Sequence, residues 1–154
     1  MKKLLFGLIA LAFVASSCKQ TIEKEVKIVN DSTVVAPRDG IFYHISSGIN
    51  DPHKVVMALK QAVMMAEDKD VLVYFDIKGI EVVLNDANDI SYPTFPTSKE
   101  SLKILLDKGI TVFACPACLK AAGKSESDLM PGVKLAEKEA FFNFTKGRIL
   151  TLDY

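Results

Sequence analysis

Residues 108–123 read KGITVFACPACLKAAG, and this stretch is the most informative about the fold. Residues 110–114 (ITVFA) form a short, continuous apolar run, which is typical of a strand buried on both faces of a parallel sheet. Cys115 and Pro116 follow in the order of an N-cap residue and a first helical residue. Gly123 ends the expected helix, as a C-cap glycine does. The stretch therefore predicts a strand, a tight turn and a helix.

The same alternation extends in both directions from this stretch. Residues 71–77 (VLVYFDI) form a second buried run, and residues 41–45 (IFYHI) a third. Asp51 and Pro52 are typical of a helix start, and the apolar spacing predicts a helix over residues 53–66. Other expected elements are a helix capped by Ser98 and running through Asp107, a strand over 133–136, a helix over 137–146 and a strand over 149–152. Strands that alternate with helices predict an α/β fold with a mainly parallel sheet covered on both faces.

Composition limits the domain count and excludes some classes of function. A chain of 154 residues, 49% apolar and 25% charged, has room for one domain with a packed core. Nineteen Lys and Arg residues balance nineteen Asp and Glu residues, so nothing indicates a basic surface for nucleic acid. The sequence has no glycine-rich phosphate loop and no metalloprotease histidine pair, and we expect no cofactor.

The first residues have the pattern of an export signal. Two lysines, an apolar run over residues 4–14 and a small-residue triplet precede Cys18. The run is too short to span a bilayer, and its end resembles the lipobox of bacterial lipoproteins. This resemblance implies cleavage after residue 17 and lipid attachment at Cys18; a plain signal peptide is the alternative. We expect an exported protein, lipid-anchored to a bacterial membrane and facing the periplasm.

The segment after Cys18 differs in composition from the rest of the chain. Residues 18–39 mix charged and polar residues with scattered Val and Ile and end close to Pro37. We interpret them as a lipid-anchored tether, although residues 26–28 fit a short strand as well. The domain organisation is therefore a signal over residues 1–17, a tether over 18–39 and an α/β domain over 40–154.

Cys115 and Cys118 are the candidate catalytic residues. At an N-cap, the sulfur of Cys115 faces free backbone N–H groups and the positive end of the helix dipole, which favour the thiolate. Cys118 lies one turn further along, where a resolving thiol would lie. Three alternatives remain open: a structural disulfide, an inert buried pair, and a zinc site completed by His44 and His53.

Four further residues are possible neighbours of this site. His44 lies near a strand end, either as a packed residue or as a base or hydrogen-bond partner. Gly79 interrupts the apolar sequence after residue 77. Tyr92 and Phe95 belong to an irregular connection over residues 85–97, and either cover Cys115 as a lid or pack on the domain edge.

Three stretches together resemble a known family: IFYHISSG (41–48), VLVYFDIKGIEVVLND (71–86) and KGITVFACPACLKAAG followed by SDLMPGV. They are similar to the DsrE/DsrF-like proteins, which have a YchN-like fold and include sulfur-relay subunits. The resemblance implies a three-layer α/β/α sandwich over residues 40–154 that assembles into trimers or hexamers. It also implies that Cys115 is the cysteine that accepts persulfide sulfur. Cys118 is not part of the sulfur-relay pattern.

These observations lead to one main functional hypothesis. We expect a membrane-anchored thiol protein that handles sulfur, as a persulfide carrier, or redox equivalents through Cys115 with Cys118, together with an unidentified sulfur or redox partner. The helix over 53–66 is apolar over a wide arc and carries three methionines, which favours a homo-oligomer. The alternative is a non-catalytic binding or assembly module with a structural Cys115–Cys118 disulfide. A thioredoxin-like enzyme is disfavoured because too few residues follow Cys118.

Overall fold

A computed structural model describes residues 35–154 of the chain. The expected signal peptide, the lipidation site at Cys18 and the tether up to residue 34 lie outside the described residues. Among the described helices, none is both long enough and apolar enough to cross a membrane.

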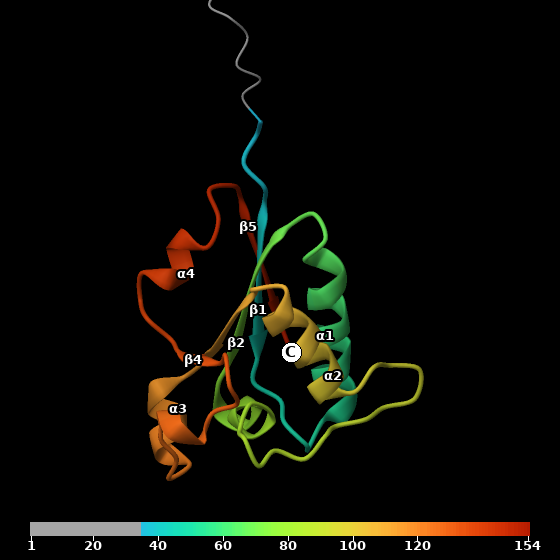
Figure 1. Ribbon diagram of the computed structural model, residues 1–154, viewed down its shortest axis with the longest axis vertical. Coiled ribbons are helices and arrows are strands. Elements are labelled where there is room, and N and C mark those ends of the chain that lie inside the picture. Colours follow the sequence, from blue (N-terminus) through green and yellow to red (C-terminus); the bar gives the residue numbers. More distant parts are fainter. Residues whose placement is uncertain (1–34) are drawn as a thin grey trace, which may run out of the picture. The chain divides into compact units, whose positions relative to one another are not determined.

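The centre of the domain is a parallel sheet of five strands (Figure 1). The strands are β1 (Gly40–Ile45), β2 (Asp70–Phe75), β3 (Thr111–Ala114), β4 (Lys134–Leu135) and β5 (Ile149–Asp153). Their order is β4-β3-β2-β1-β5, and every neighbouring pair is parallel. The expected α/β fold with a parallel sheet is therefore confirmed.

Helices cover both faces of this sheet, in the three layers expected. The α-helices are α1 (Pro52–Met65), α2 (Ser98–Asp107), α3 (Pro116–Ala121) and α4 (Ala140–Asn143), and two 3-10 helices, η1 (Ile77–Val82) and η2 (Glu126–Asp128), complete the list. In Figure 1, α1 and α2 lie together on one side of the sheet and α4 lies on the other.

Alternation along the strands divides the apolar side chains between the two faces. Tyr43 and Ile45 of β1 and Val73 and Phe75 of β2 are fully buried on the face that packs against α1 and α2. The opposite face carries an aromatic cluster, in which the ring of Phe141 from α4 lies across other rings. Its centroid is 5.6 Å from that of Phe42 and 5.2 Å from that of Tyr74. The ring of Phe141 comes from α4, which is a single helical turn.

Two expected elements differ from the structure. The helix expected over 137–146 is the single turn α4; beyond it the Thr145 hydroxyl bonds backbone groups outside the helix, an alternative to helical structure that Thr side chains offer. This hydroxyl donates to the carbonyl of Arg38 at 2.6 Å and accepts from the N–H of Gly147 at 3.0 Å. The N-cap of α2 is Thr97, whose hydroxyl accepts from the N–H of Glu100; Ser98 is the first helical residue.

Candidate thiol site

Cys115 leaves the sheet at the carboxyl end of β3 and begins α3. Its N–H donates to the carbonyl of Phe75 at 2.8 Å, which fixes the residue beside the end of β2. Its sulfur accepts a hydrogen bond from the N–H of Cys118 at 3.4 Å, and Pro116 is the first helical residue. Cys115 is therefore the N-cap residue of α3, as the sequence predicts.

The Tyr74 hydroxyl is the group that lowers the pKa of Cys115 most. Burial raises the pKa of Cys115, but hydrogen bonds from the Tyr74 hydroxyl and from the N–H groups of Cys118 and Ala117 outweigh burial and lower it. The sequence analysis missed Tyr74. The alternation of side chains along the strands explains its position. Tyr74 pairs with Phe113 in the parallel register, and Cys115 lies two residues after Phe113, so all three point to the same face.

Cys118 has different surroundings. The backbone N–H of Ile77 lowers the pKa of this thiol, but burial, its hydrogen bond to Cys115 and the negative charge of Asp76 together raise it. Cys115 is thus the more acidic of the two thiols, in the direction that the sequence predicts. Both cysteines are free thiols, and both are partly accessible.

The segment beside Cys118 is held in an unusual backbone conformation. Ile77 has a φ of +45°, which is strained for a β-branched residue. Gly79 follows, and its N–H donates to the carbonyls of Asp76 at 2.7 Å and Ser46 at 3.1 Å. A Cβ at this position would lie 2.1 Å from the carbonyl oxygen of Ile45. Gly79 therefore acts in the site through the backbone, by allowing the segment to approach the end of β1.

His44 links three strand ends on the same face as Tyr74. Its Nδ1 lies 2.7 Å from a carboxylate oxygen of Asp153, and its Nε2 lies 2.9 Å from one of Asp76. Burial lowers the pKa of His44, but the hydrogen bonds to Asp76 and Asp153 outweigh burial and raise it. The ring also stacks near that of Tyr74, at 5.6 Å between centroids. Of the two interpretations of His44, the hydrogen-bond partner is the one that the structure supports.

Tyr92 and Phe95 do not lie with the cysteines. The ring of Tyr92 stacks in parallel on that of His53 in α1, at 4.2 Å, and Phe95 meets the same ring at 5.3 Å. The ammonium of Lys60 lies 4.9 Å from the centre of the Phe95 ring. In Figure 1 this loop extends past α1 and α2, on the side away from α3. Of the two alternatives, these contacts match packing on the domain edge rather than a lid over Cys115, because His53 of α1 contacts both rings and Lys60 contacts Phe95.

The same contacts separate His53 from the two cysteines. His53 lies on α1 between Tyr92 and Phe95, so it does not complete a ligand set with Cys115 and Cys118. Across residues 35–154, no three His, Cys, Asp or Glu side chains gather in a way that could hold a metal ion.

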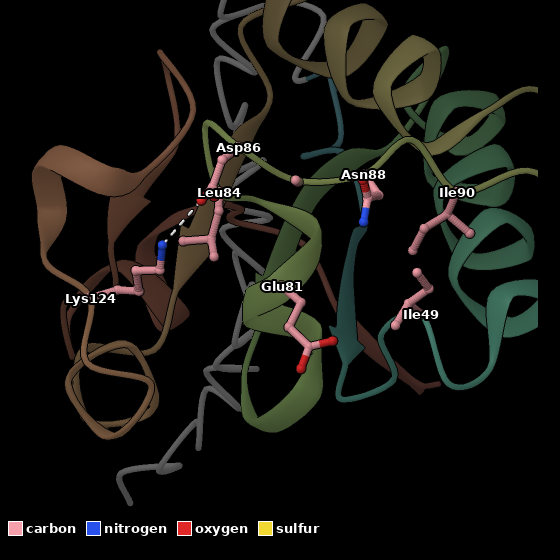
Figure 2. Close-up of a pocket in the computed structure, with 8 residues that line it drawn as sticks. Ile49, Glu81, Leu84, Asp86, Asn88, Ile90 and Lys124 are labelled. Carbon is pink, nitrogen blue, oxygen red and sulfur yellow. Dashed lines mark hydrogen bonds and ion pairs between the residues drawn. The ribbon is translucent and has the colours of Figure 1, made fainter.

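A separate cavity of about 250 Å³ lies near the start of α1 and the end of η1 (Figure 2). Ile49 and Ile90 form part of its apolar wall, and Glu81 points toward it. At its far side, the ammonium of Lys124 pairs with Asp86 at 3.2 Å. Neither cysteine lines this cavity, so it is not part of the thiol site.

Two solved structures share this architecture. The ychN protein from E. coli has a TM-score of 0.59 and 15% sequence identity, over 75% of this chain and 99% of that chain. MTH1491, a protein of unknown function from Methanobacterium thermoautotrophicum, has a TM-score of 0.53 and 14% identity, over 75% of this chain and 99% of that chain. At these identities the likeness shows the fold alone.

Comparison of the sequence with known families gives a match that covers the whole sheet up to the start of β5. No curated protein matches the sequence. Residues 39–149, which include both cysteines, match the DsrE/DsrF-like family. The chain belongs to the DsrE/DsrF-like family.

Proposed function

We propose that this chain is a membrane-anchored sulfur carrier that accepts sulfur as a persulfide on Cys115. The observation that carries the proposal is the set of hydrogen-bond donors around the Cys115 sulfur. The Tyr74 hydroxyl and the N–H groups of Ala117 and Cys118 all favour the thiolate. The thiolate, rather than the thiol, is the nucleophilic form of cysteine.

Membership of the DsrE/DsrF-like family supports a sulfur-relay or redox-related role at a coarse level. The pKa shifts of the two thiols indicate which cysteine reacts first. Cys115 has the lowered pKa and Cys118 the raised one, so Cys115 is the sulfur that attacks first. Partial exposure of Cys115 leaves its sulfur accessible to a donor.

The loading step is a thiol exchange on a persulfide donor. The Cys115 thiolate attacks the outer sulfur of the donor, and a new S–S bond forms between that sulfur and Cys115. The S–S bond of the donor breaks, and its electron pair leaves on the donor thiolate. No net oxidation of the protein and donor pair occurs, because the outer sulfur keeps its oxidation state. Donors at the Cys115 sulfur stabilise the thiolate that makes this attack.

Intact mass tests this proposal. The reduced protein, incubated with a low-molecular-weight persulfide, desalted and measured at once, should gain the mass of sulfur on Cys115. Cys115→Ser should gain none, whereas Lys120→Ala, an exposed change on the same helix, should load like the wild type. Equal loading of the wild type and Cys115→Ser would contradict the proposal. A Cys115–Cys118 disulfide that resists reduction in the folded protein would instead favour the non-catalytic binding module.

We also propose that Cys18 carries lipid and anchors the domain to a bacterial membrane on its periplasmic side. The sequence before Cys18 has the charge, apolar run and small residues of an export signal. Two or more acyl chains anchor a protein stably. Cys18→Ser should therefore release the protein from the membrane fraction or leave the precursor unprocessed. Identical fractionation and identical mass of the two forms would reject the anchor.

A homo-oligomer, as a trimer or hexamer, is the assembly that we propose. Met64 on α1 is 55% exposed and Leu150 on β5 is 55% exposed, so apolar side chains remain uncovered in the single chain. The strand β5 also lies at an edge of the sheet. Light scattering on the domain from Gly40 onward should give a mass of three chains or more. A monomer at micromolar concentration would reject this assembly.

A further inference from the structure

Cys118 lies one helical turn beyond Cys115, and its N–H donates to the Cys115 sulfur at 3.4 Å. Both cysteines are partly accessible free thiols. The Cys115 sulfur would be the inner atom of a Cys115 persulfide. Cys118 is thus placed for attack on the inner sulfur.

The surroundings of Cys118 favour its protonated thiol form. The carboxylate of Asp76 and the Cys115 sulfur both oppose a second negative charge at Cys118. Asp76 is itself fixed by hydrogen bonds from Ser46 at 2.8 Å and from His44 at 2.9 Å. Cys118 consequently starts as a thiol, its proton passes to the outer sulfur of the persulfide, and the resulting Cys118 thiolate is the attacking form.

Resting on the proposed function, we propose that Cys118 resolves the Cys115 persulfide and that the chain releases its sulfur as hydrosulfide. The product is a Cys115–Cys118 disulfide, so the protein discharges sulfur rather than only carrying it. The cysteine pair has the Cys-x-x-Cys spacing, which permits disulfide closure within one helical turn.

The step balances in atoms, charge and electrons. Cys118 attacks the inner sulfur, and a bond forms between the two protein sulfurs. The bond between the inner and outer sulfur breaks, and its electron pair leaves on the outer sulfur. The Cys118 proton goes to that sulfur, so hydrosulfide departs. The outer sulfur is reduced to sulfide and the two protein thiols are oxidised to a disulfide. A dithiol reductant must then reopen the disulfide before another cycle.

The position of Cys118 one turn along the same helix gives this step an advantage over attack by an external thiol. A second thiol held next to the reacting atom replaces a bimolecular collision with an intramolecular reaction. We therefore expect sulfide release without added thiol, at a rate independent of protein concentration.

The experiment follows sulfide and protein mass in the same sample. Reduced wild type, Cys118→Ser and Lys120→Ala proteins are loaded with a low-molecular-weight persulfide, desalted and incubated without thiol under nitrogen. The wild type and Lys120→Ala should release sulfide, approaching one per chain, and should end with the mass of the disulfide form. Cys118→Ser should retain the added sulfur on Cys115 and release at least ten times less sulfide over the same period.

The outcomes separate the two proposals. If Cys118→Ser fails to load while remaining folded by circular dichroism, the carrier function itself fails. If Cys118→Ser loads and the loaded wild type keeps its sulfur for as long, the carrier function stands and sulfide release is overturned. Transfer of the sulfur to Cys118, seen by peptide mapping as a modified Cys118 without sulfide release, overturns it as well.

Discussion

The Nε2 atom of His44 lies 2.9 Å from a carboxylate oxygen of Asp76, the residue that begins the segment beside Cys118. The other nitrogen of the same ring lies 2.7 Å from a carboxylate oxygen of Asp153 at the end of β5. A protonated imidazole donates through both nitrogens, whereas a neutral one has a single N–H. The charged form of His44 therefore joins the ends of β1, β2 and β5 near the thiol site.

This contact predicts a pH-dependent contribution of His44 to stability. Its pKa is raised in the folded protein by Asp76 and Asp153 despite burial, so the contribution is fully present below the unfolded pKa of about 6.5 and is lost as pH rises through the folded pKa. His44→Gln should lower the free energy of unfolding most at pH 5–6 and progressively less at higher pH. Denaturant unfolding of both proteins across this range measures the difference.

The control for His44 is a histidine that does not contact Asp76 or Asp153. His53→Gln removes a histidine that lies on α1 against Tyr92 and Phe95, away from any Asp76 contact. Its stability loss at pH 5–6 should be smaller than that of His44→Gln, because the His53 ring packs on Tyr92 and Phe95 rather than between two carboxylates. If the stability loss of His44→Gln grew as pH rises, it would contradict a stabilising interaction of protonated His44 with Asp76 and Asp153.

Tyr74 predicts a change in the reactivity of Cys115. Removing its hydroxyl takes away a hydrogen bond that favours the thiolate, so Tyr74→Phe should raise the pKa of Cys115. Iodoacetamide at neutral pH should then modify Cys115 several times more slowly than in the wild type. In both proteins Cys118 should react more slowly than Cys115. Mass spectrometry of alkylated peptides at a series of pH values measures both effects.

Tyr43→Phe is the matched control, because it removes the same group on the other face of the sheet. Among the described residues, the buried Tyr43 hydroxyl has no hydrogen-bond partner. Its removal should leave the alkylation rate of Cys115 unchanged and should leave stability equal or higher by about 1 kcal/mol. Equal rates in Tyr74→Phe and the wild type would show that the hydroxyl does not activate Cys115.

Local features of the sequence predicted most of the fold. The apolar runs over 71–77 and 110–114 predicted β2 and β3 to within two residues, because strands buried on both faces leave a continuous apolar pattern. The end of β2 was placed too late, since Ile77 is apolar yet takes a positive φ and begins η1. Apolar character alone does not report backbone conformation.

The site was predictable only where it is local in sequence. Cys115 as an N-cap depends on its immediate neighbours, so the sequence identified it. Tyr74 and Asp76 reach the cysteines from a different strand, and Asp153 reaches His44 from another. Their placement requires the strand order and register, which a single sequence does not contain. For the same reason the sequence left two positions open for Tyr92 and Phe95, and their partners on α1 decide between them.

Gly79 predicts a large loss of stability on a small substitution. A Cβ there would lie 2.1 Å from the backbone carbonyl oxygen of Ile45, which cannot move without displacing the end of β1. Gly79→Ala should therefore cost about 2–3 kcal/mol of unfolding free energy. It should also change the alkylation rate of Cys118, because Ile77 and Asp76 belong to the displaced segment.

Gly123→Ala is the control for the same substitution without a clash. Nothing lies within 4 Å of a Cβ at Gly123, although its φ of +70° makes alanine unfavourable. We expect a cost of about 1 kcal/mol there, from the backbone alone. A smaller loss at Gly79 than at Gly123, by denaturant unfolding, would reject the close approach as the reason for glycine.

Ile77 predicts the opposite sign, because its backbone is already strained. Its side chain is 64% exposed, so replacing it removes little burial, and glycine adopts a φ of +45° without the steric cost of a β-branched residue. Ile77→Gly should keep or raise the free energy of unfolding, by up to about 1 kcal/mol. Ile49→Gly, at a residue that is 56% exposed with no positive φ, should instead lose about 0.5–1 kcal/mol.

Because the donor to Cys118 is the backbone N–H, Ile77→Gly should leave Cys118 alkylation near the wild-type rate. Equal stability losses in the two variants would show that the positive φ stores no strain beside Cys118.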